Sequence, residues 1–188
     1  MSITASPYGL SQVAYKGGKF RAALSTYYIA SGYGTSFGQG DPVQMGNNGY
    51  VQSYADAPPT APSNTIPGVV GQFWNGNVMT LGQFVSVTYV NTQGQTIIAP
   101  YWPAGTMTLN GAAAIVTVND LPYVIYQVQA NGQVNAGKPA IGFNYNMITS
   151  GVNAPNPITG QSQAALNSVT GQYINDTLKI VGLADAKI

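Results

Sequence analysis

Glycine and proline recur about every eight to twelve residues along this chain, and they separate short runs of β-branched and aromatic residues. The 188 residues include 23 glycines and 12 prolines. Because both residue types favour turns and interrupt helices, this spacing is typical of β-sandwiches and β-barrels. The sequence therefore predicts an all-β fold, a β-sandwich or a jelly-roll-like barrel with long loops rich in proline and glycine.

Ten runs have the residue types and the length of β-strands. In the clearest, Phe84–Val90, the odd-numbered positions share one face, and Ser86 and Thr88 lie on the other. Such alternation predicts a sheet with one buried and one more hydrated face. The predicted strands are Tyr27–Ala30, Val43–Met45, Tyr50–Tyr54, Val69–Trp74, Phe84–Val90, Gln95–Ala99, Ile115–Val118, Val124–Ala130, Ile141–Asn146 and Thr177–Val181.

Several junctions between these runs have the composition of tight turns. Asn91–Gly94 predicts a hairpin between the Phe84 strand and the next one, Asn47–Gly49 predicts a turn between two short strands, and Asn131-Gly132 ends the Val124 strand. Helix is scarce. Gln161–Ser168 is the one stretch with the composition for two helical turns, and the β-branched residues after it favour an early stop.

The chain divides into an N-terminal arm with the first turn, residues 1–26, and a single β-rich domain, residues 27–188. The first nine residues are polar and end in Pro7-Tyr8-Gly9, so we expect an extended arm that becomes ordered on contact with a partner. Ala55–Pro67 contains four prolines and predicts an extended loop within the domain. This loop has two interpretations, an arm laid along a neighbouring molecule or an ordinary surface loop.

Charged residues make up only 6% of the chain, against roughly 25% in an ordinary soluble domain. A polar but uncharged surface is less costly to desolvate than a charged one, so this composition favours burial between partners. The net charge is +1 and the one basic cluster, Lys16, Lys19 and Arg21, is small, so we expect no nucleic-acid partner. No run reaches the roughly 18 apolar residues that span a bilayer, so we expect no membrane partner.

The sequence contains no histidine, cysteine or glutamate. It therefore lacks the usual general base, the strongest nucleophile and the commonest metal ligands. The five carboxylates belong to aspartates that are scattered singly along the chain, and no phosphate-binding loop is present. We expect no enzymatic activity, no cofactor and no metal site.

The most plausible contact residues are aromatic side chains and the proline-rich loop, because tyrosine and tryptophan bring a large contact area at a small cost in conformational entropy. Tyr27 and Tyr28 are adjacent on a predicted strand, so one of them faces away from any given core. The same rings are also suited to stacking on sugars. The predicted interface residues are Tyr8, Leu10, Tyr27, Tyr28, Tyr33, Pro58, Pro59, Pro62, Tyr101 and Trp102.

Three stretches resemble a family of capsid decoration, or cement, proteins of short-tailed phages. The first runs from Pro7 to Val13 and leads into a Gly17-Gly18 turn, then Tyr28–Tyr33 and Gly40–Val43. The second is Ile115–Gln129 around Asn119-Asp120-Leu121-Pro122, and the third is Leu178–Leu183. Together they cover about half of the chain as an ordered series of weak motifs.

The resemblance implies a β-rich body assembled as dimers or trimers on the outside of a virion, with the major capsid protein as partner and no catalytic residues. Residues 1–10 lack the features of a signal peptide, so we expect synthesis in the host cytoplasm. The alternative is a glycan- or host-binding head-fibre or adhesin domain, which would share the same β-rich, tyrosine-bearing and charge-poor composition.

Overall fold

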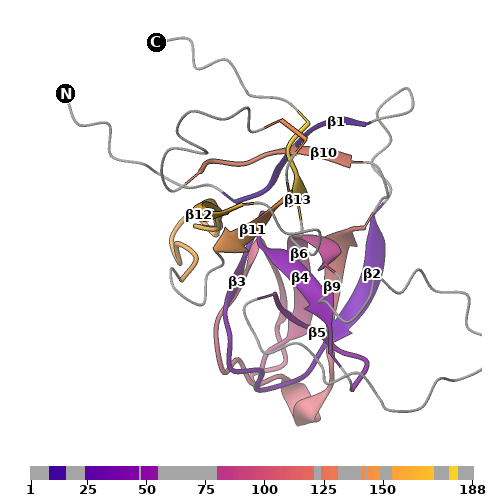
Figure 1. The fold of residues 1–188 in the computed structure, drawn as a ribbon. Helices are drawn as coiled ribbons and strands as arrows, with labels where there is room; N and C mark the ends of the chain where they lie inside the picture. The colour runs from indigo at the N-terminus through magenta and orange to yellow at the C-terminus, as the bar shows by residue number, and fades with distance from the viewer. Residues whose placement is uncertain are drawn as a thin grey trace, which may run out of the picture.

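The computed structural model describes residues 9–15, 24–46, 48–54, 80–120, 124–130, 141–142, 144–148, 154–171 and 178–181. These residues form an all-β fold of antiparallel strands, as predicted (Figure 1). A short 3₁₀ turn, η1 (Leu109–Gly111), is the one helical segment among them. The strands are β1 (Ser11–Tyr15), β2 (Ser25–Ile29), β3 (Phe37–Gly38), β4 (Pro42–Met45), β5 (Val51–Ser53), β6 (Thr80–Val90), β7 (Thr96–Ala99), β8 (Tyr101–Trp102), β9 (Ala114–Asn119), β10 (Val124–Gln127), β11 (Asn144–Ile148), β12 (Ala165–Gly171) and β13 (Leu178–Lys179).

A six-stranded sheet forms the larger part of the described structure. Its strand order is β2-β9-β6-β4-β5, and β7 pairs with β6 beside β4. The sheet curls so that its two end strands, β2 and β5, come into contact, and the Tyr33 hydroxyl accepts a 2.7 Å hydrogen bond from the Ser53 N–H of β5. The curled sheet encloses a core of fully buried side chains, namely Ile29, Phe37, Val43, Val51, Phe84, Val87, Trp102, Ala114, Val116 and Val118.

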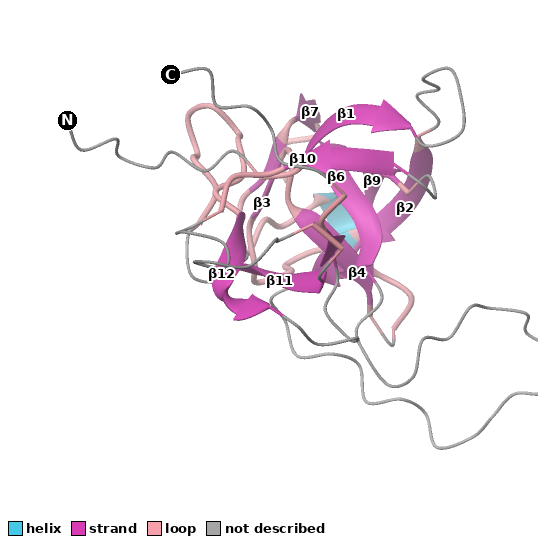
Figure 2. Cartoon of the chain, turned by 45° about the horizontal axis from the view of Figure 1, so that its top comes forward, coloured by secondary structure: helices cyan, strands magenta, loops and turns pink. Residues whose placement is uncertain are grey.

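The smaller part of the structure lies at one end of this sheet, at the top of Figure 1. It consists of a β1–β10 ribbon and a three-stranded sheet of order β12-β11-β13; in Figure 2, β1 lies beside β10 and β12 beside β11. Its buried side chains form a second apolar cluster of Leu10, Tyr145, Met147, Ala164 and Leu166. Within the predicted N-terminal arm and first turn, residues 1–26, Ser11–Tyr15 form β1 and pair with β10, and the predicted boundary at residue 26 lies inside β2.

A β-bulge changes the expected pattern of the Phe84 strand. Phe84 pairs with Val118 and Ser86 with Thr117, so Val85 is an extra residue opposite the β9 ladder. Phe84 and Val87 are both fully buried, whereas Val85 is only half-buried. The expectation that Val85 shares the core face is therefore wrong, because the bulge shifts the alternation by one residue.

Two predicted hairpins are confirmed. Asn91 accepts hydrogen bonds on its side-chain oxygen from the N–H groups of Gln93 (3.0 Å) and Gln95 (2.9 Å), and Gly94 has a φ of 81°. This turn joins β6 to β7. The second hairpin joins β4 to β5, and the Gly46 N–H donates to the Tyr50 carbonyl oxygen across it (2.8 Å). Local side-chain capping and positive φ at glycine fix both registers.

The predicted helix at Gln161–Ser168 is wrong. Ala165 and Leu166 begin strand β12 and pair with Ile148 and Met147 of β11. Burial of Ala164 and Leu166 in the second cluster outweighs the modest helix propensity of this stretch. The Val69–Trp74 strand, the Ala55–Pro67 loop and the Asn131-Gly132 turn lie outside the described residues.

Candidate functional site: an uncharged outer sheet face

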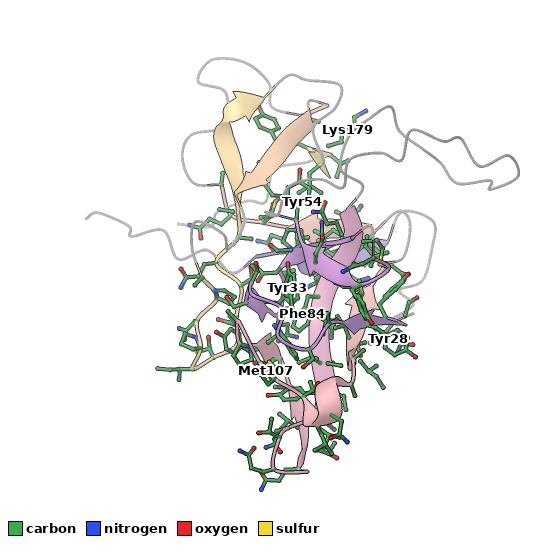
Figure 3. The ribbon with its side chains drawn as sticks, turned by 90° about the horizontal axis from the view of Figure 1, so that it is seen from below. Tyr28, Tyr33, Tyr54, Phe84, Met107 and Lys179 are labelled. Carbon is green, nitrogen blue, oxygen red and sulfur yellow. The ribbon has the colours of Figure 1, made fainter. Side chains whose placement is uncertain are left out.

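The charges of the described residues are few and mostly engaged within the chain. They belong to Asp41, Asp120 and Lys179. Asp41 is buried, Asp120 is half-buried, and Lys179 is exposed on β13 of the small sheet (Figure 3). The exposed surface of the six-stranded sheet therefore depends on uncharged side chains.

Registers between four strands align those side chains in rows on the outside of the sheet. One row runs across β2, β9, β6 and β7, where Tyr28 pairs with Ile115, Ile115 with Thr88, and Thr88 with Ile98. Tyr28 is 56%, Ile115 44% and Ile98 75% exposed. We call the nine outward positions of these strands the outer face; they are Thr26, Tyr28, Ser86, Thr88, Val90, Thr96, Ile98, Ile115 and Thr117.

The alternation of each strand explains why these residues face outward. On β9, Val116 and Val118 are fully buried, and Ile115 and Thr117 between them are not. Tyr28 lies away from Tyr33 and Phe84, which are together inside the sheet in Figure 3. All nine side chains are uncharged, and seven of them are β-branched, so the outer face is stiff and costs little side-chain entropy when a partner covers it.

Asp120 directly follows β9 and is held by the neutral hydroxyl groups of two β2 residues. Ser25 donates a 2.8 Å hydrogen bond to its Oδ1, and Tyr27 donates to its Oδ2. Burial, followed by this hydrogen bond and the negative charge of Asp120, raises the pKa of Tyr27 to about 12. Burial and the same charge raise the pKa of Tyr126 to about 12. This cluster fixes the start of β2 against the end of β9.

These raised pKa values predict alkaline destabilisation. Because both phenols are neutral in the folded chain up to a pKa of about 12 and ionise near 10 when unfolded, their contribution is complete below pH 10 and is lost as the pH rises toward 12. Urea unfolding midpoints measured between pH 8 and pH 12 should fall more steeply for the wild type than for a Tyr27→Phe, Tyr126→Phe double variant. Equal slopes would contradict the prediction.

Eight of the ten predicted interface residues fall into three groups. Tyr28 is exposed on the outer face, and Tyr101 is half-buried beside Trp102 on β8. The Tyr27 and Tyr33 hydroxyls hydrogen-bond to Asp120 and Ser53 of this chain. Tyr8, Pro58, Pro59 and Pro62 lie outside the described residues.

The predicted contact roles of Leu10 and Trp102 are wrong, because both side chains are buried. Leu10 is 3% exposed in the second cluster, and Trp102 is fully buried in the first. Both side chains fill the interior of the chain itself, so neither presents a surface to a partner. Their aromatic or apolar character alone did not distinguish a core position from a contact position.

Ile98 and Ile115 were not among the predicted contact residues. The adjacent pair Ile97-Ile98 could have indicated an exposed isoleucine. Neighbouring residues of a strand face opposite ways, so one of the two must point outward. Ser86 and Thr88 were predicted on the more hydrated face, which is the face that the structure leaves outermost. The sequence does not reveal the strand registers that place these residues in one row.

The described residues contain no group of three or more histidine, cysteine, aspartate or glutamate side chains that would hold a metal ion. None of the helical segments in the same part of the chain is long and apolar enough to cross a membrane. Comparison with protein-family models, curated proteins and solved structures gave no match to this chain.

Proposed function

We propose that this chain is a structural virion protein that binds the outside of a tailed-phage capsid and reinforces the contacts between capsomers. The observation that carries the proposal is the outer face, where nine outward positions on four neighbouring strands include no charged side chain. The resemblance of the sequence to capsid decoration proteins supplies the identity of the partner. A protein partner that covers the outer face gains apolar burial without desolvating an ion.

The physical role of such a protein is to add interface area. A stable contact buries about 800 Å² per partner, and apolar area contributes roughly 25 cal/mol per Å² before association costs are subtracted. Packaged DNA presses outward on a shell, so a small domain that bridges neighbouring capsomers raises the free energy needed to separate them. Many symmetric copies act together, and weak individual contacts accumulate.

Ile115→Lys tests the outer face directly, because Ile115 occupies the middle of the Tyr28–Ile98 row. A buried ammonium group without a partner is costly, so we expect binding to shells that lack this protein to weaken at least about tenfold. The unfolding free energy should change little, since Ile115 is 44% exposed in the free chain. Co-sedimentation of the purified protein with shells, measured over a concentration series, gives the affinity.

Ile158→Lys is the matched control. Ile158 is 93% exposed in a turn outside the outer face, so the same charge is added without touching the proposed contact. We expect the control to bind shells and to restore their resistance to heat-induced DNA release, and Ile115→Lys to do neither. If the wild-type protein shows no affinity for shells, the proposal is refuted. If the protein is retained on a glycan array and Tyr28→Ala abolishes that retention, host recognition is favoured instead.

A further inference from the structure

Strand β7 lies at an edge of the sheet formed by the described strands. Among the strands that the structure describes, β7 (Thr96–Ala99) pairs only with β6. The Asn91 N–H donates to the Gln95 carbonyl oxygen (2.9 Å), which makes Asn91 and Gln95 a hydrogen-bonded pair at the base of the turn. Antiparallel ladders alternate between bonded and non-bonded pairs, so Ile97 and Ala99 bond to β6. The N–H and C=O groups of Thr96 and Ile98 therefore point away from it.

Apart from its short length of four residues, this edge lacks the usual protection against pairing with another strand. Natural edges carry charged side chains, an internal proline or a bulge. The β7 segment Thr-Ile-Ile-Ala has no charge and no proline within the strand, and its ladder with β6 is regular over all four residues. Thr96 is exposed, and Ile98 is 75% exposed. The edge thus offers two donors and two acceptors beside a large apolar side chain.

We propose that β7 pairs antiparallel with β7 of a second copy of this chain, around a two-fold axis at Ile97. The alternation of outward groups favours this register, because it alone uses both outward residues of each four-residue strand: Thr96 of one copy lies opposite Ile98 of the other and forms two hydrogen bonds on each side of the axis. A second copy is the occupant that fits, because the same four residues supply both strands and their neutrality removes like-charge repulsion.

The pairing joins two curled sheets edge to edge and places the two outer faces next to each other. Ile98 of one copy then packs beside Thr96 of the second copy, since both residues point to the outer side of the sheet. This inference stands independently of the capsid proposal, because it concerns the purified chain alone. If both hold, the shell contacts a doubled outer face.

A single cysteine tests the two-fold axis, since the chain contains none of its own. Ile97 of each copy would meet its counterpart at a non-hydrogen-bonded position, where Cα atoms are about 4.5 Å apart, within the range for a disulfide. We expect purified Ile97→Cys to form a covalent dimer under mild oxidation at least tenfold faster than Ile158→Cys, whose 93% exposed side chain lies elsewhere. Equal rates for the two variants would overturn the proposed register.

Proline at position 98 tests the edge without breaking the hairpin. The Ile98 N–H points away from β6, so Ile98→Pro removes a donor of the proposed dimer and no bond of the β6–β7 ladder. Light scattering on an eluting column should show a dimer for the wild type and for Ile98→Val, and a dissociation constant raised at least about tenfold for Ile98→Pro. A wild-type protein that stays monomeric at all concentrations would overturn the proposal whatever the variants do.

Discussion

Replacement of Trp102 by alanine is expected to lower the free energy of unfolding by about 4 kcal/mol. Trp102 is fully buried, and its ring lies edge-on to that of Tyr89 with centroids 5.4 Å apart. It belongs to strand β8, which pairs with β3 next to Phe37. The substitution would leave a large cavity between β3, β6 and β8, which the close-packed core can fill only in part.

Trp102→Phe provides a sharper comparison. The indole N–H is buried without a hydrogen-bond partner in the described structure, so phenylalanine removes volume but also removes an unpaired donor. We expect a loss of only about 1–2 kcal/mol for this variant. Urea unfolding followed by circular dichroism measures both values, with Tyr28→Ala as the surface control, expected within about 0.5 kcal/mol of the wild type. A Trp102→Ala variant as stable as Tyr28→Ala would contradict the core assignment.

The burial of Trp102 is not predictable from the sequence alone, unlike other parts of the fold. The all-β fold was predictable because alternation and turn composition are local signals, and the hairpins at Asn91 and Asn47 follow from those signals directly. Strands β3 and β8 have two residues each and no alternation to detect. Their pairing, and hence the burial of Trp102, depends on contacts between residues about 65 positions apart in the sequence.

The outer face was predictable in part for the same reason. Alternation placed Ser86 and Thr88 on the hydrated side of their strand, and it required one of Tyr27 and Tyr28 to face outward. The alignment of Tyr28 with Ile115 and Ile98 required the registers between four strands. The bulge at Val85 sets one of those registers, and no residue type in that stretch indicates a bulge.

Asp41→Ala is expected to cost about 3 kcal/mol of unfolding free energy, the second largest effect. Asp41 is 1% exposed, and its Oδ2 accepts a hydrogen bond from the Gly38 N–H (2.7 Å). Its Oδ1 accepts from the Ser162 hydroxyl, whose oxygen in turn accepts from the Ala164 N–H (2.9 Å). Alanine at position 41 would leave the Gly38 and Ser162 donors buried without this acceptor, at about 1–3 kcal/mol each.

Asp41→Asn and Ser162→Ala separate the two bonds. An asparagine oxygen can still accept from Gly38, and its amide group can donate to the Ser162 oxygen, so we expect a loss of about 1 kcal/mol. Ser162→Ala removes both bonds of the hydroxyl and should cost about 2 kcal/mol. Because Asp41 and Ser162 share one bond, the Asp41→Ala, Ser162→Ala double variant should lose less than the sum of the single losses, by 1 kcal/mol or more in a double-mutant cycle.

The position of the Asp41 carboxylate determines which part of the chain is destabilised when its hydrogen bond to Ser162 is lost. Asp41 immediately precedes β4 of the large core, whereas Ser162 precedes Ala164 of the second cluster. Gly9 and Leu10 connect the two parts, since the Gly9 N–H donates to the Ala164 carbonyl oxygen (3.2 Å) and the Leu10 N–H donates to the Gly40 carbonyl oxygen (2.8 Å). Loss of the Asp41–Ser162 bond should therefore lower hydrogen-exchange protection at Leu166 more than at Val116. An equal loss of protection at both amides would show that the two clusters unfold as one unit and that the Asp41–Ser162 bond does not stabilise one of them selectively.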